Sequence, residues 1–153
     1  MTYDFAVQNR QGKKGEDLIR QYFRKEWLIT PSTMPDQKRG IDFYFQHRRD
    51  GIFCTVEVKT DSKASSTGNG FFEIYSAIPN KKGWAHTCQA DYFFYLLPQD
   101  RLIYVFRPSS FPELLKRWAH YPTRNIPNKS WITQGHLVPL SEFEKHASKI
   151  ISF

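Results

Sequence analysis

Residues 41–46 read Ile-Asp-Phe-Tyr-Phe-Gln, and residues 52–59 read Ile-Phe-Cys-Thr-Val-Glu-Val-Lys. Both runs are rich in β-branched and aromatic residues, which favour strands. The segment that joins them, His-Arg-Arg-Asp-Gly, ends in Asp50-Gly51, a strong turn signal. The two runs are therefore predicted to form an antiparallel hairpin.

Charged residues interrupt both predicted strands. Side chains of a strand alternate between its faces, so Glu57 and Lys59 point to one side of the second strand. Asp42 lies on the first strand, among apolar residues. Burying a charge is costly, so charged groups in apolar strands need a reason. An acid two residues before a lysine also occurs in two predicted loops, at Asp36/Lys38 and Asp61/Lys63.

This set of residues fits phosphodiester hydrolysis, which requires a neutralised phosphate and an activated water. Mg²⁺ usually takes one or two carboxylates, together with waters and substrate phosphate. Asp42 and Glu57 can supply the carboxylates, and the backbone carbonyl of Val58 can supply a third ligand. Lys59 can orient the water or stabilise the developing negative charge. An ordinary ion pair on an exposed strand and a surface position of Asp42 are the alternatives.

The remaining patterns predict a mixed α/β fold in a single domain over residues 1–153, with a central mixed, largely antiparallel sheet flanked by helices. Further strands are expected at residues 71–75, 91–97, 102–107 and 130–138. Helices are expected at residues 9–27, 84–89 and 110–120, and at the C-terminus from the capping-box spacing of Ser141 and Glu144. Loops are expected at residues 31–40, 61–70 and 121–129 from their polar, Pro and Gly content.

Composition narrows the class of protein. The 153 residues are 40% apolar and carry a net charge of +7, which is typical of a small globular protein that binds a polyanion. Two cysteines, Cys54 and Cys88, are too few for a disulfide framework and fit a reducing compartment. No run approaches the roughly 18 apolar residues of a membrane span. We expect a soluble, cytoplasmic protein.

The order of the motifs resembles the PD-(D/E)XK nuclease superfamily, which has the restriction-endonuclease-like fold. In that family a helix bearing a glutamate precedes an acid on one strand and an acid-x-lysine on the next. The matching segments are Gly15-Glu16, Gly40-Ile41-Asp42 and Glu57-Val58-Lys59, with Gln89 at a looser downstream polar position. The proline of the family name is absent before Asp42, a loss that is common in the superfamily.

The resemblance implies a Mg²⁺-dependent endodeoxyribonuclease in which Mn²⁺ can substitute. It assigns metal binding to Asp42, Glu57 and Val58, and adds Glu16 and Gln89 to the catalytic set with Lys59. For Glu16, a surface acid or an ion pair is the alternative. The compact size is typical of Holliday-junction-resolvase-like, phage and homing members. A homodimer or a higher homo-oligomer is expected, because cutting a duplex or a junction needs two sites.

Basic and polar residues near the motifs are predicted to contact DNA, mostly through its phosphates. They are Lys13, Lys14, Arg20, Arg24, Lys63, Asn69, Lys81 and Lys82. Two other functions stay open: a catalytically inactive DNA-binding module on the same fold, and a protein whose motif is accidental. For residues 108–153 the sequence leaves three alternatives open: a dimer interface, a DNA-reading element or a cover for the sheet.

Overall fold

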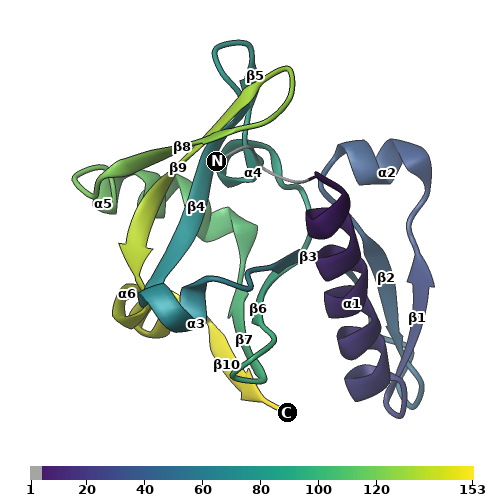
Figure 1. Cartoon of the computed structure of the whole chain (residues 1–153). Helices are drawn as coiled ribbons and strands as arrows, with labels where there is room; N and C mark the ends of the chain where they lie inside the picture. The colour runs from purple at the N-terminus through teal and green to yellow at the C-terminus, as the bar shows by residue number, and fades with distance from the viewer. Residues whose placement is uncertain (1–4) are drawn as a thin grey trace.

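The computed structural model describes residues 5–153 and contains two β-sheets with helices packed around them (Figure 1). The larger sheet has six strands in the order β1-β2-β3-β6-β7-β10. Their bounds are β1 (Trp27–Pro31), β2 (Phe43–His47), β3 (Phe53–Thr60), β6 (Tyr92–Leu97), β7 (Leu102–Phe106) and β10 (Lys149–Ser152). All neighbours in it run antiparallel except β3 and β6, which are parallel.

The smaller sheet is antiparallel and has the order β5-β4-β9-β8. Its strands are β4 (Asn69–Ala77), β5 (Lys81–Lys82), β8 (Thr123–Pro127) and β9 (Ile132–Pro139). In Figure 1 this sheet stands to the left of β3, and α1 (Phe5–Phe23) stands to its right. The end of β3 therefore lies between the long helix and the smaller sheet.

Five shorter α-helices connect the strands. They are α2 (Met34–Lys38), α3 (Ala64–Thr67), α4 (Trp84–Thr87), α5 (Phe111–Arg117) and α6 (Leu140–His146). A 3₁₀ turn, η1 (Pro108–Ser110), leads into α5. Among the residues that the structure describes, no helix is long and apolar enough to cross a membrane.

Two apolar cores lie on the two faces of the larger sheet, because strand side chains alternate. On one face, Ile19 of α1 packs with residues such as Phe45, Val56 and Leu96. On the other face, the next residues along the strands, such as Tyr95, pack with the smaller sheet and the shorter helices. Glu57 and Lys59 belong to this second face. The side chains of β2 and β3 on this face are half-buried or exposed, and they do not belong to the apolar core.

The predicted hairpin is confirmed, with Phe43 opposite Val56 and Phe45 opposite Cys54 in an antiparallel register. The predicted fold class is also confirmed: a mixed α/β protein with mostly antiparallel strands and helices against them. The aromatic strands at residues 92–97 and 102–106 are buried, as their patterns indicate. Both cysteines are free, as expected.

Several predicted boundaries are wrong. The helix expected at residues 9–27 ends at Phe23, and Trp27 begins strand β1 instead. Trp27 packs against Phe45 on the α1 side of the sheet, at a ring-centroid distance of 5.9 Å, so tertiary packing overrides the helical spacing. The expected loops contain α2, α3 and β8, and β1, β5 and β10 were not predicted. Helix α6 begins at Leu140, one residue before the predicted cap Ser141.

Gly15 allows α1 to approach β3 closely. A Cβ atom at Gly15 would lie 1.9 Å from the hydroxyl oxygen of Thr60 and 3.1 Å from the Leu96 side chain, whereas one at Gly12 would meet nothing within 4 Å. We expect Gly15→Ala to lower the free energy of unfolding by about 1–3 kcal/mol through overpacking. The matched variant Gly12→Ala should raise it by up to about 1 kcal/mol through helix propensity. Urea unfolding measures both, and equal effects would contradict this packing.

Candidate active site

The two strand acids meet at one edge of β3. Strand β2 pairs with β3 only as far as Val56, so the next part of that edge is open to Asp42. The backbone N–H of Asp42 donates to the Val56 carbonyl at 2.9 Å, and Asp42 Oδ2 accepts the N–H of Val58 at 2.8 Å. Ser32 N–H holds the Asp42 carbonyl at 2.9 Å. Backbone hydrogen bonds therefore fix both the main chain and the carboxylate of Asp42.

The carboxyl groups of Asp42 and Glu57 lie close enough to hydrogen-bond to each other. Burial raises the pKa of Glu57 to about 9, and the neighbouring charge of Asp42 adds to the increase. Burial also raises the pKa of Asp42, against the opposing effects of the Val58 N–H and the hydrogen bond with Glu57. Two such carboxyls cannot both ionise easily, so near neutral pH the pair retains a proton.

The pair fits a hard divalent cation. Glu57 Oε2 is buried, and among the described residues no donor other than the Asp42 carboxyl is near enough to satisfy it, so a cation can take the place of the shared proton. The N–H and C=O of an extended residue project from the same strand edge, so the carbonyl of Val58 faces the side on which Asp42 lies. Within residues 5–153, no cluster of three or more His, Cys, Asp or Glu forms a metal site. Two carboxylates and a carbonyl suit Mg²⁺ better than a metal that needs such a cluster.

Lys59 lies on the same face of β3 as Glu57 and is half-buried. Its positive charge lowers the pKa of both Asp42 and Glu57, which opposes the effect of burial. None of the ion pairs within 4 Å in the described part of the chain involves Lys59. The ammonium group is therefore near the acids without being neutralised by a direct contact.

Glu73 of β4 approaches Lys59 from the smaller sheet, and the sequence did not assign Glu73 to the site. Burial raises the pKa of Glu73, while the charge of Lys59 is the largest opposing influence. Glu73 Oε2 also accepts the N–H of Trp84 at 3.0 Å, at the start of α4. Glu73 could have been found by the pattern that indicated Glu57, because both are carboxylates inside an apolar strand.

Glu16 reaches the site from α1. Burial raises the pKa of Glu16, and the negative charge of Asp42 is the next largest cause. The close approach at the neighbouring Gly15 holds this turn of the helix against the end of β3. The three segments that match the family motifs thus come together, although they are far apart in the sequence.

The backbone of Gln89 is tied to the segment that leads into Asp42. Its N–H donates to the Arg39 carbonyl at 2.9 Å, and the thiol of the preceding Cys88 donates to the Gly40 carbonyl at 3.3 Å. Burial raises the pKa of Cys88 to about 12, so the thiol stays protonated. Gly40 has φ +73°, which favours glycine, and it turns the chain into Ile41 and Asp42.

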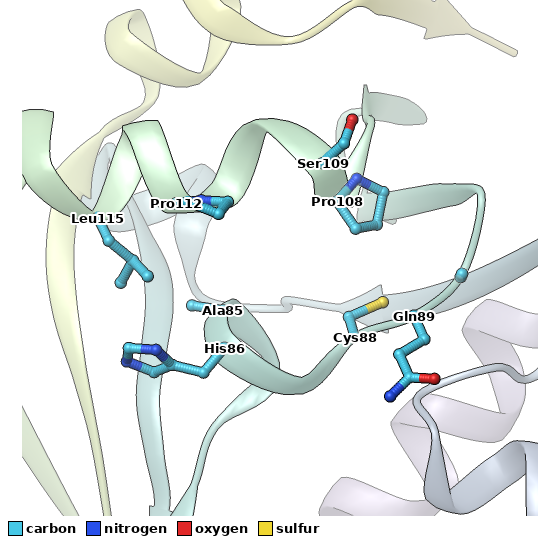
Figure 2. A pocket seen from close by; sticks show the side chains of 9 residues that line it. Ala85, His86, Cys88, Gln89, Pro108, Ser109, Pro112 and Leu115 are labelled. Atoms are coloured by element: carbon cyan, nitrogen blue, oxygen red, sulfur yellow. The ribbon is translucent and has the colours of Figure 1, made fainter.

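A cavity of about 450 Å³ adjoins this segment, between α4 and the start of α5. It is lined mainly by apolar side chains, with His86, Gln89 and Ser109 as polar members. Figure 2 shows the Gln89 side chain turned away from Leu115 and Pro112, toward the N-terminal part of the chain. Gln89 is exposed, and its side chain makes no hydrogen bond to any of residues 5–153. Gln89 is therefore at the rim of the site rather than bound to the acids.

The residues predicted to contact DNA divide into two groups. Most of them are exposed: Lys13, Lys14, Arg24, Lys63, Lys81 and Lys82. Arg20 is half-buried, and its guanidinium lies over the Phe43 ring at 5.0 Å, so part of its role is packing against the sheet. Asn69 is half-buried at the start of β4.

Comparison with known proteins gives a structural match only. No protein-family model matches the chain, and no curated protein matches it by sequence. A solved structure of a bacterial homing endonuclease, I-Ssp6803I, is similar, with a TM-score of 0.51 and 18% sequence identity. The similarity covers 85% of this chain and 77% of that protein. At this identity the match shows a shared fold alone.

Proposed function

We propose that this protein is a DNA endonuclease of the PD-(D/E)XK type that uses Mg²⁺ or Mn²⁺ to hydrolyse phosphodiester bonds. The observation that carries the proposal is the paired carboxyls of Asp42 and Glu57 at the open edge of β3, with Lys59 on the same side as Glu57. The fold shared with a homing endonuclease supports DNA as the substrate. The net charge of +7 supports binding to a polyanion.

In this proposal Asp42, Glu57 and the carbonyl of Val58 hold the cation. When bound, the cation would neutralise phosphate charge and make a nearby water more acidic. Lys59 orients the attacking water or stabilises the negative charge that develops on the phosphate. Glu16 extends the acidic wall from α1, and Gln89 is placed at the rim for a contact to water or substrate.

The DNA is held chiefly through its phosphates by the exposed basic residues on α1 and directly after it, on the segment after β3 and on β5. We further propose that the enzyme acts as a homodimer, since one chain provides one catalytic centre and both strands of a duplex must be cut. Sequence-specific, junction-specific and non-specific nucleases can all share such a centre, because loops and dimer geometry determine which DNA is cut.

Cleavage assays test the proposal. Supercoiled plasmid and a synthetic four-way junction are incubated with Mg²⁺, with Mn²⁺ and with a chelator, beside a Glu57→Ala variant. We expect nicked or linear product with either metal, none with chelator, and none from the variant. DNA binding without product in all conditions would favour the inactive binding module. Neither binding nor cutting would mean that the motif is accidental.

A further inference from the structure

The pairing of the smaller sheet places one arginine on the same face as Glu73. Glu73 of β4 is opposite Gly135 of β9, and Gly135 is opposite Arg124 of β8. Residues directly opposite each other across strands share a face, so Glu73 and Arg124 point to the same side. Gly135, between Glu73 and Arg124, has no side chain. The ring of Phe71 covers Gly135, because a Cβ atom at Gly135 would lie 2.6 Å from that ring.

This face borders the proposed catalytic centre. The opposite face carries Phe72 and Val138, which are buried in the core. The N–H of Phe71 donates to the Tyr95 hydroxyl at 2.9 Å, and that hydroxyl donates to Asp61, two residues after Lys59. These bonds hold the start of β4 at the end of β3. Phe72 and Val138 occupy the core-facing side, and Glu73 on the other side lies within electrostatic reach of Lys59. The face that carries Glu73 and Arg124 is therefore turned away from the core, and its Glu73 part faces the end of β3.

The charges of the smaller sheet suit a polyanion. Residues 69–82 and 123–139 contain one acid, Glu73, whose carboxylate already accepts the Trp84 N–H. The same segments contain four basic residues, all exposed: Lys81, Lys82, Arg124 and Lys129. None of the four takes part in the ion pairs found within residues 5–153. Their positive charge is therefore available to a ligand.

We propose that the hairpin of β8 and β9 contacts the backbone of duplex DNA, with Arg124 binding a phosphate near the bond to be cut. This inference rests on the proposed nuclease function and adds a DNA-contacting element that the sequence did not assign. A two-stranded ribbon can lie along DNA or enter its major groove. An arginine can bind a phosphate through two parallel hydrogen bonds.

The edge position of β8 raises the alternative that a second copy of the chain pairs with it. The strand Thr-Arg-Asn-Ile-Pro disfavours that pairing, because Pro127 lacks an N–H donor and Arg124 is charged. Charged residues and proline are the features by which natural edge strands avoid such association. The charge and the edge chemistry together favour DNA over a second copy.

Equilibrium binding to fluorescent duplexes in EDTA tests this inference without any need for catalysis. Arg124→Ala should weaken binding by about five- to tenfold at 0.1 M salt, and should reduce the slope of log affinity against log salt by about 1. The loss should be equal for two duplexes of unrelated sequence, since a phosphate contact carries no base preference. Arg124→Lys should keep most of the salt slope, which controls for folding.

The matched control is Arg117→Ala, which removes the same charge from an exposed site on α5 and should change binding by less than about twofold. Equal binding by wild type and Arg124→Ala would overturn the inference and leave the nuclease proposal intact. A change in sedimentation with unchanged DNA affinity would also overturn it, in favour of self-pairing. If the wild type shows no metal-dependent cutting while Arg124→Ala still weakens DNA binding, the nuclease proposal alone would be contradicted.

Discussion

Lys59→Ala is expected to slow DNA cleavage by about 10³-fold while leaving DNA bound. The reason is the position of the ammonium group, which lies near the paired carboxyls without being held by a direct ion pair in the described part of the chain. A group so placed acts on charge that develops during the reaction, so its removal should affect the rate more than the affinity. Single-turnover cleavage at saturating protein and binding in EDTA measure the two effects separately.

The control for charge is Lys145→Ala, which removes an exposed lysine of α6. This variant should cleave within about twofold of the wild type, since a distant surface charge is screened by salt. Cleavage by Lys59→Ala at a rate near that of Lys145→Ala would remove Lys59 from the catalytic set. A loss of binding equal to the loss of cleavage would make Lys59 a DNA contact instead.

Glu57→Gln is expected to abolish cleavage and, in chelator, to stabilise the protein at high pH. The pKa of Glu57 is about 9 in the folded protein, against an ordinary value of 4.5. The folded state therefore favours the protonated carboxyl, and this stabilisation is complete below pH 4.5 and is lost as the pH rises toward 9. Glutamine stays neutral, so the variant avoids the loss and gains about 2–4 kcal/mol over the wild type at pH 9.

Urea unfolding in EDTA at pH 5, 7 and 9 measures this difference. The two proteins should be similar in free energy of unfolding at pH 5 and should separate as the pH rises. Glu113→Gln, at an exposed acid of α5, is the control and should follow the wild type at every pH. A wild type that becomes more stable than Glu57→Gln at high pH would mean that the two carboxyls do not compete for charge.

Strand β3 could be predicted because its signal is local. Alternation along residues 52–59 put Glu57 and Lys59 on one face, and Asp50-Gly51 indicated the hairpin that brings Asp42 alongside. The contact of Asp42 with the Val58 N–H could not be predicted, since it depends on where β2 stops pairing. The place of Glu16 near the acids depends on how α1 packs against β3. The family resemblance indicated this place, whereas the periodicity of the helix did not.

The edge strands were missed for a related physical reason. Strand β10 pairs with β7, more than 40 residues earlier, and β8 is a polar edge strand that ends in Pro127. Neither has the alternation of apolar and polar residues that marks a half-buried strand. The separate smaller sheet depends on the long-range pairing of β4 with β9, which also fixes the position of Arg124 on β8.

The most direct test of the account is the binding of Mn²⁺ to the paired carboxyls, measured by calorimetry at pH 7.5 in two buffers of different ionisation enthalpy. Because the pair retains a proton at this pH, we predict the release of about one proton for each cation bound. Asp42→Asn and Glu57→Gln should lose the binding and, with it, the proton release. Equal Mn²⁺ binding by the wild type and both variants, or binding without proton release, would contradict the assignment of this edge of β3 as the catalytic metal site.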